Sequence, residues 1–252
     1  MPERITSRAN PLIGEIRRLA GSAAFRREQG RMVCDSPKLL EEACRWRVPL
    51  ETVLYTDGIV LPPLPESCRL VSVPEDLMAY ASPMKTPQGV LFTCRIEVSP
   101  LPEVLTGRRY VVLDGVQDPG NVGTVLRTLD AFDGDGLLLL SGCADPYSPK
   151  AVRSSMGAVF RRQIWNCGVE ELASRLRQSE LPLYGAALRQ DTVDVRSVAL
   201  GRSLIAIGSE GRGLSDAVLA LCHKTVRIPM SERCESLNAA AAAAVLLWEA
   251  YR

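Results

Sequence analysis

The second half of the chain alternates short apolar runs with helical segments, and this alternation restricts the fold more than any other feature. Buried strands are expected at residues 110–113, 137–140, 159–165, 183–187, 203–207 and 225–228. Helices are expected at residues 121–132, 169–178, 214–221 and 237–251. Strands that are apolar throughout and separated by helices are typical of a parallel sheet covered on both faces. Ligands of such sheets bind at the carboxyl ends of the strands, so a functional site is expected in the loops that follow them.

The first hundred residues also mix helices and strands, but in shorter pieces. Helices are expected at residues 11–20, 22–29, 37–47 and 74–80, and strands at Val33 and at residues 52–55, 70–73 and 89–94. Two prolines and a glycine in SPLPEVLTG mark residues 99–107 as a linker. The chain is therefore predicted to be an α/β protein with a small domain at 1–98, this linker, and a parallel-sheet domain at 108–252.

Composition excludes several classes of protein. With 46% hydrophobic and 23% charged residues, the 252-residue chain has the profile of a globular protein. The longest apolar run, 239–248, is about half of the ~20 residues that span a bilayer. The start, MPERITSRAN, lacks the apolar core of a signal peptide. Eight cysteines without a CxxC and a single histidine, His223, argue against a disulfide framework or a metal site. We expect reduced thiols, a cytoplasmic location, no membrane partner and no metal.

Charge is nearly balanced overall, with 30 Lys and Arg against 29 Asp and Glu, but it is uneven along the chain. Residues 1–31 contain seven arginines against three glutamates, a net charge of +4. Arginine suits contact with phosphate, so this cluster could bind nucleic acid, although a solvated helical face would look the same. The candidate RNA contacts are Arg8, Arg17, Arg18, Arg26 and Arg27.

The loop at residues 113–128, LDGVQDPGNVGTVLRT, joins an expected strand to a helix. Gly115 and Gly120 have the spacing of a P-loop, but Asn121 and Val122 replace the required Lys and Ser/Thr. This replacement argues against ATP binding by this route, and the absence of a GxGxxG motif argues against a nucleotide-dependent oxidoreductase. Asn121 could cap the helix, and Arg127 could hold a phosphate or a hydroxyl group.

Two later loops also follow expected strands. In LIAIGSEGRGLSD, residues 204–216, Glu210 lies among three glycines and could either cap a helix or orient a ligand. Glycines there would allow a ligand to approach the backbone closely. In residues 226–252, Pro229 ends a strand, and Ser236 is a candidate N-cap for an alanine-rich helix. The alanines suit a tight core or a helix interface.

Taken in their order and spacing, the three loops resemble the three motifs of the SpoU/TrmH family of RNA 2′-O-methyltransferases, within the SPOUT class. The matching residues are Pro119, Asn121, Gly123 and Arg127; Gly208, Glu210, Gly211, Gly213 and Leu214; and Ile228, Pro229, Met230, Ser236, Leu237 and Asn238. The resemblance covers residues 108–252. Residues 1–98 resemble, more weakly, a ribosomal-protein-like RNA-binding domain. The chain departs from the family pattern at Glu232, where glycine is usual, and at Asp35-Ser36, where Glu-Gly is common.

The resemblance implies a C-terminal trefoil knot, S-adenosylmethionine as cofactor, and a homodimer whose site is built from both subunits. It implies catalytic roles for Arg127, Asn121, Glu210, Ser236 and Asn238. It implies cofactor contacts at Gly208, Ile228, Leu237, Met230 and Ala187. The implied activity is 2′-O-methylation of structured RNA, with 23S ribosomal RNA favoured. The alternatives are a tRNA 2′-O-methyltransferase and a catalytically silent, ribosome-associated RNA-binding protein.

Overall fold

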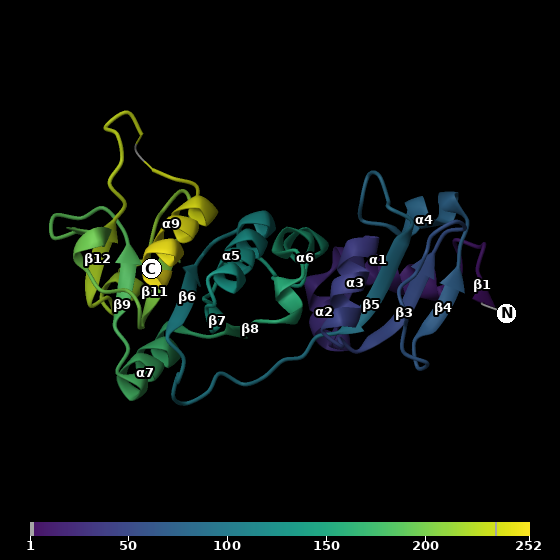
Figure 1. Cartoon of the computed structure of the whole chain (residues 1–252), viewed down its shortest axis with the longest axis horizontal. Helices are drawn as coiled ribbons and strands as arrows, with labels where there is room; N and C mark the ends of the chain where they lie inside the picture. The colour runs from purple at the N-terminus through teal and green to yellow at the C-terminus, as the bar shows by residue number, and fades with distance from the viewer. Residues whose placement is uncertain (1–2, 235) are drawn as a thin grey trace. The chain divides into compact units, whose positions relative to one another are not determined.

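The computed structural model describes residues 3–234 and 236–252, which form two compact units (Figure 1). The first unit contains the chain up to Glu97 and residues 145–160, and the second contains residues 98–144 and 161–252. The break at 97–98 lies next to the end of the first domain expected from the sequence. Residues 99–107, expected to be a linker, pack into the second unit, where Leu101 and Leu105 join the hydrophobic core and the Leu105 amide donates to Ser179 Oγ at 2.8 Å.

The first unit is built on a five-stranded mixed sheet in the order β1-β4-β3-β5-β2. Its strands are β1 (Glu3–Arg4), β2 (Arg31–Asp35), β3 (Leu50–Tyr55), β4 (Arg69–Ser72) and β5 (Val90–Arg95). Its first four helices are α1 (Pro11–Gly21), α2 (Ala23–Gln29), α3 (Pro37–Arg45) and α4 (Glu75–Ala81). Apolar side chains of α1 and α4, such as Ile16 and Leu77, are fully buried in one core with Val71 and Leu91 of the sheet. The α/β character expected for this part is confirmed.

Helix α6 (Pro149–Ser155) and the 3₁₀ turn η1 (Ala158–Phe160) pack with the first unit, although they lie far along the sequence. Arg153 Nη2 binds the buried Asp35 carboxylate at 2.7 Å. The residue after Asp35, Ser36, has a φ of 97°, a conformation that favours glycine, and its hydroxyl caps α3. The strand expected at 159–165 is wrong in its first half, because two successive arginines follow η1 and the strand starts only after them.

The second unit contains a seven-stranded sheet in the order β10-β12-β9-β11-β6-β7-β8, and every paired strand is parallel, as expected. Its strands are β6 (Arg109–Asp114), β7 (Gly136–Leu139), β8 (Gln163–Asn166), β9 (Leu183–Ala186), β10 (Val193–Asp194), β11 (Ser203–Gly208) and β12 (Lys224–Arg227). Its helices are α5 (Pro119–Ala131), α7 (Val169–Ser179), α8 (Asp216–Leu219) and α9 (Ala239–Tyr251), with a 3₁₀ turn, η2, at Val195–Ser197.

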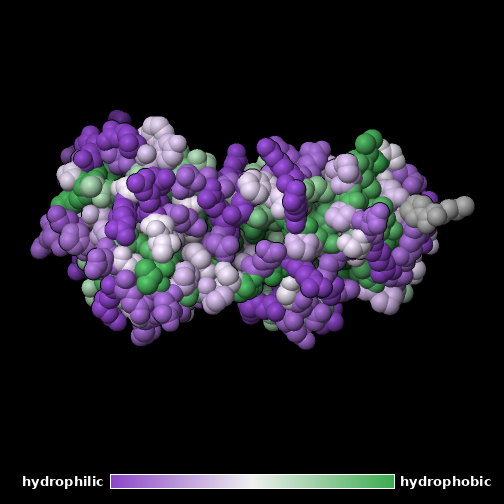
Figure 2. Space-filling view, turned by 60° about the horizontal axis from the view of Figure 1, so that its bottom comes forward, coloured by the Kyte–Doolittle hydropathy of each residue, from purple (hydrophilic) through white to green (hydrophobic). Residues whose placement is uncertain are grey.

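Both faces of this sheet are covered, which explains why its strands are apolar throughout. One face packs side chains such as Val112 and Leu204 against α7 and α8. On the other face, α5 contacts β6 and β7, α9 contacts β11, and the two helices pack against each other (Figure 1). Among the residues described, no helix is long and apolar enough to cross a membrane. The face in Figure 2 is mostly hydrophilic, with hydrophobic residues in small patches.

Candidate active site

The carboxyl ends of four neighbouring strands meet at one edge of the second sheet. Asp114 at the end of β6 lies opposite Gly208 at the end of β11, and Ala186 of β9 lies opposite Val226 of β12. Because the strands are parallel, the loops that follow them emerge at the same edge. The three loops singled out in the sequence are therefore neighbours in space.

A chain of hydrogen bonds joins one residue from each of these loops. Asn121 Nδ2 donates to Glu210 Oε1, and Asn238 Nδ2 donates to Asn121 Oδ1 at 3.1 Å. Asn238 Oδ1 in turn accepts the backbone amides of Ala240 and Ala241 at 2.9 and 3.2 Å. Three of the predicted catalytic residues thus connect the starts of α5 and α9 to the loop after β11.

The capping roles considered for the motif residues are wrong. Asp118 caps α5, accepting the Gly120 amide at 2.5 Å, with Pro119 at the first helical position, where proline is favoured. Asn121 lies within the helix, so its side chain is available for the hydrogen-bond chain. Asn238, and not Ser236, caps α9, because that helix begins at Ala239.

The loop after β11 closes on itself. Ser209 and Gly213 exchange two backbone hydrogen bonds of 3.1 and 2.9 Å, and Gly213 has a φ of +67°. A Cβ atom at Gly208 would lie 2.0 Å from the carbonyl carbon of Gly213 and 2.3 Å from the Leu214 nitrogen. The sequence suggested that glycine here leaves space for a ligand. In the structure, the chain's own backbone occupies that space, so the loop itself requires Gly208.

A cavity of about 140 Å³ lies at the same edge of the sheet, and its lining is mostly apolar. Four of the five predicted cofactor residues line it, namely Ala187, Ile228, Met230 and Leu237, and so does Ser236. Gly208 does not line it. The remaining lining residues were not predicted from the sequence; they are Ala186, Leu188, Val226, Arg227, Ala242 and Leu246. Most of these follow or end strands β9 and β12, so the rule that ligands bind at strand ends could have indicated them.

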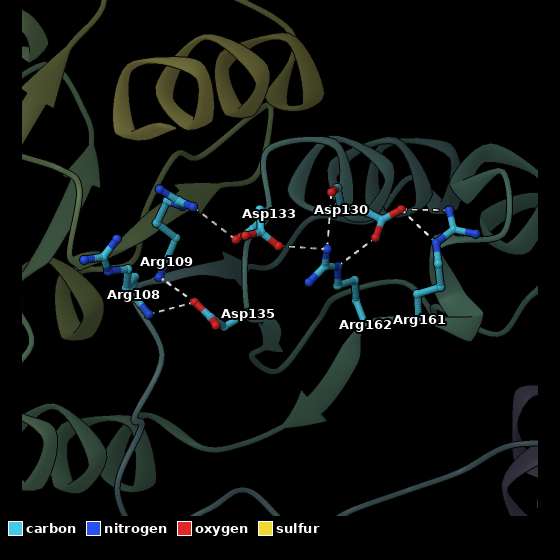
Figure 3. A network of polar contacts seen from close by, with 7 residues as sticks. All are labelled: Arg108, Arg109, Asp130, Asp133, Asp135, Arg161 and Arg162. Carbon is cyan, nitrogen blue, oxygen red and sulfur yellow. Dashed lines mark hydrogen bonds and ion pairs between the residues drawn. The ribbon is translucent and has the colours of Figure 1, made fainter. Parts of the chain in front are cut away.

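Arg127 lies on α5, about a turn and a half after Asn121, and its side chain is exposed. It makes no hydrogen bond or ion pair with any residue that the structure describes. The carboxylate one turn further along, that of Asp130, is bound by Arg161 and Arg162 (Figure 3). Among the described residues, Arg127 is therefore outside the hydrogen-bond chain, and its guanidinium group is exposed.

Three exposed arginines of the first unit stack on aromatic rings. The guanidinium carbons of Arg8 and Arg17 lie 4.8 and 3.9 Å from the centre of the Tyr80 ring, and that of Arg18 lies 3.8 Å from the centre of the Phe25 ring. Arginine held over a ring keeps its outer donors available for phosphate.

Arg26 requires a correction, because it is only 4% exposed and cannot contact RNA from this position. Its Nη2 binds Asp145 Oδ2 at 2.6 Å, its Nε binds the same oxygen at 2.8 Å, and its Nη1 donates to the carbonyls of Leu19 and Ala20. Its neighbour Arg27 is exposed. The positive cluster therefore divides into surface residues and one buried ion pair that fixes residues 145–160.

Residues 108–248, more than half of the chain, match the model of the SpoU rRNA Methylase family. The chain belongs to this family. The 23S rRNA (guanosine(2553)-2′-O)-methyltransferase RlmP of Bacillus subtilis is 30% identical to this SpoU methylase, over 83% of this chain and 84% of that protein. The 23S rRNA (uridine(2479)-2′-O)-methyltransferase of Streptomyces viridochromogenes is also 30% identical, over 99% of this chain and 92% of that one.

Solved structures extend the similarity to the fold of both units. The AdoMet-bound rRNA methyltransferase from Sinorhizobium meliloti superposes on this SpoU methylase with a TM-score of 0.86 and 28% identity, covering 98% of this chain and 97% of that one. The fold predicted from the family resemblance, a parallel-sheet SPOUT domain in a mixed α/β protein, is confirmed.

Proposed function

We propose that this SpoU methylase transfers a methyl group from S-adenosylmethionine to the 2′-hydroxyl of a ribose in RNA. The observation that carries the proposal is the hydrogen-bond chain Glu210–Asn121–Asn238, beside a cavity at the carboxyl edge of a parallel sheet. Two relatives that match most of this chain are named as 2′-O-methyltransferases of 23S rRNA, which favours ribosomal RNA as substrate and hence a cytoplasmic location. A relative named as a tRNA/rRNA methyltransferase, 34% identical over 98% of this chain, keeps tRNA as the alternative.

The cavity has features that suit an adenosyl group. Its lining side chains are mainly apolar, and strand ends supply backbone donors and acceptors of the kind that orient small ligands. Its volume of about 140 Å³ is that of a part of the cofactor, since sites for whole ligands of this size are usually ~300 Å³ or more. Ala187, Ile228, Met230 and Leu237 would hold this part. S-adenosylmethionine, when bound, supplies a methyl group on a sulfonium, which is already a good leaving group.

The protein must then position the ribose and stabilise the charge that forms as the hydroxyl loses its proton. Arg127 is the predicted residue for this role, and it has no other partner in the part of the chain that the structure describes. A guanidinium group rarely loses a proton, so we assign Arg127 to binding the forming alkoxide and the neighbouring phosphate rather than to acting as a base. Asn121, bound on both sides, holds the start of the helix that carries it.

Substitution of Arg127 tests this assignment. Arg127→Ala should abolish methyl transfer to RNA while the affinity for S-adenosylmethionine, measured by titration calorimetry, stays within about twofold. Arg127→Lys should also fail across the whole pH range, because one ammonium group cannot reproduce two fixed donor directions. Lysine activity that rises at alkaline pH would mean that residue 127 acts as a base. Normal activity in the alanine variant would overturn the assignment.

We further propose that the first unit binds the RNA through Arg8, Arg17, Arg18 and Arg27, with Arg26 withdrawn from this set. The stacking of three of these side chains on Tyr80 and Phe25 supports the proposal. Replacing Arg17 and Arg27 with Gln should weaken RNA binding and reduce its salt dependence by about two phosphate contacts, while cofactor binding is retained. An unchanged salt slope would assign these arginines to a solvated face.

We also propose a homodimer formed through α9, whose catalytic site is shared between subunits. Val245, Trp248 and Tyr251 are 40%, 54% and 51% exposed on this helix, a large apolar surface for a single helix end. The alanines that the sequence offered as an interface are only partly available, because Ala240 and Ala243 are buried. Light scattering should give about twice the 27.5 kDa chain mass. Trp248→Glu should give monomers that lack methyl transfer, and an active monomer would refute the shared site.

The C-terminal trefoil knot is likewise a proposal. Strand β12 lies beyond β9 from β11, whereas the next element, α9, returns to pack on α5. This return of the chain toward an earlier helix after β12 supports the proposal of a knot near the site.

A further inference from the structure

The carboxylate of Asp130 is held by two arginines that come from outside its own helix (Figure 3). Asp130 Oδ2 accepts from Arg161 Nε at 2.9 Å and from Arg161 Nη2 at 2.7 Å. Asp130 Oδ1 accepts from Arg162 Nε at 2.7 Å. Both carboxylate oxygens are therefore occupied, and Arg161 provides two of the three bonds.

These contacts stabilise the charged form of Asp130. Burial alone would raise the pKa of this carboxyl, but the hydrogen bonds from Arg161 and Arg162 outweigh it and leave the pKa lowered. The side chains of Asp130 and Arg161 are only 16% and 15% exposed, so water competes weakly for this ion pair.

Asp130 lies on the same helix as Arg127, α5, and close enough along it to form an ion pair with Arg127. Residues three apart on a helix are neighbours, and opposite charges at that spacing form ion pairs. Asp130 follows Arg127 by three residues, yet Arg127 makes no ion pair within the two described segments, 3–234 and 236–252. A carboxylate that could bind Arg127 is instead bound by two other guanidinium groups.

We propose that Arg161 is a positioning residue, which binds Asp130 and so prevents this carboxylate from capturing Arg127. The Arg127 guanidinium then stays free to contact RNA. The role of Arg127 in contacting RNA rests on the proposed function. The competition between Arg161 and Arg127 for Asp130 does not, because it involves only groups of the protein itself. It predicts that in the absence of the Arg161 side chain, Asp130 forms an ion pair with Arg127. Removing the Asp130 charge as well should leave Arg127 unpaired again.

Chemical labelling of the full chain, without RNA or cofactor, tests the competition directly. Phenylglyoxal modifies free guanidinium groups faster than ion-paired ones, and mass spectrometry gives the rate at each arginine. Relative to exposed Arg27 as internal reference, Arg127 should react at least threefold more slowly in Arg161→Met than in the unaltered chain. Its rate should return in the double variant Arg161→Met/Asp130→Asn. An unchanged rate in Arg161→Met, or a rate that Asp130→Asn does not restore, would overturn the proposal.

Methyl transfer provides a second readout. Arg161→Met should lower the rate at least tenfold with unchanged affinity for S-adenosylmethionine, and the double variant should recover most of it. A merely structural role for Arg161 would make the double variant no better than the single one. Arg175→Met is the matched control, because Arg175 is 16% exposed and binds Glu171 on α7, away from α5; it should change neither labelling nor rate.

Two further outcomes are decisive. If Arg161→Met does not fold, Arg162→Gln frees the other Asp130 oxygen, and the same labelling changes are expected from it. If labelling behaves as described but the unaltered chain transfers no methyl group, the proposed function fails while the competition for Asp130 stands.

Discussion

Asn238 combines two roles that substitution can separate, and the structure allows the size of each to be worked out. Its Oδ1 caps α9 through two backbone amides, and its Nδ2 donates to Asn121. Asn238→Ala removes both. Loss of an N-cap costs about 1 kcal/mol and loss of a hydrogen bond about 1 kcal/mol more, so the second unit should lose about 2 kcal/mol of stability. That corresponds to a decrease in its melting temperature of about 4–8 °C.

Asn238→Asp keeps a capping oxygen but loses the donor and places an acceptor oxygen beside Asn121 Oδ1. A carboxylate at a helix N-terminus gains about 0.3–1 kcal/mol from the helix dipole, which offsets most of the lost hydrogen bond, so the net change should stay within about 1 kcal/mol. Hydrogen exchange provides the local assay, since the Ala240 and Ala241 amides should exchange faster in the alanine variant and near normally in the aspartate variant. If the Ala240 and Ala241 amides exchange as fast in the aspartate variant as in the alanine variant, the cap contributes little and our account of this residue is wrong.

Three further predictions concern other parts of the chain. Arg26→Leu should destabilise the first unit by about 3–5 kcal/mol in urea unfolding, because Asp145 is left without its partner, while Arg27→Leu should change stability by less than about 0.5 kcal/mol. Gly208→Ala should lower thermal stability and cofactor affinity together, because its Cβ would clash with the Gly213 backbone; a change in affinity alone would contradict this reason. The lowered pKa of Asp130 means that its contribution to stability is present above its ordinary pKa of about 3.9 and is lost as the pH falls through the lowered value. The stability difference between the unaltered chain and Asp130→Asn should therefore be constant above about pH 5 and change only below about pH 4.

Sequence patterns predicted the second sheet well because its strands are buried on both faces, and a run such as Tyr110–Leu113 then has few other interpretations. These patterns failed where the burial or conformation of a residue depends on contacts with residues far away in the sequence. Nothing local to Arg26 distinguishes it from Arg27; a carboxylate 119 residues away makes one of them a buried residue. The same applies to residues 159–160, expected to begin a strand, which instead lie in the 3₁₀ turn η1 of the first unit.

The residues of the candidate site were predicted from the spacing of the three motifs. Local helix-capping preferences, by contrast, gave partly wrong roles for these residues. Helix-capping rules favoured Asn121 and Ser236 as N-caps, yet Asp118 and Asn238 perform that role. Several side chains near a helix start can cap it, and the choice depends on where the first turn begins, which sequence places only to within a few residues. The motifs indicated part of the cavity lining but not residues such as Leu188 and Ala242, because these come from segments after β9 and within α9 that only the fold brings together.

The placement of residues 145–160 in the first unit means that the two units are not consecutive modules joined at one point. The chain passes between them three times, near residues 97, 144 and 160. A fragment that starts at residue 98 would carry α6 without the surface it packs on, and Asp145 and Arg153 would lose their ion-pair partners. Exchanging the first unit between family members, in order to transfer RNA preference, would therefore have to include α6 and its two ion pairs along with the N-terminal hundred residues.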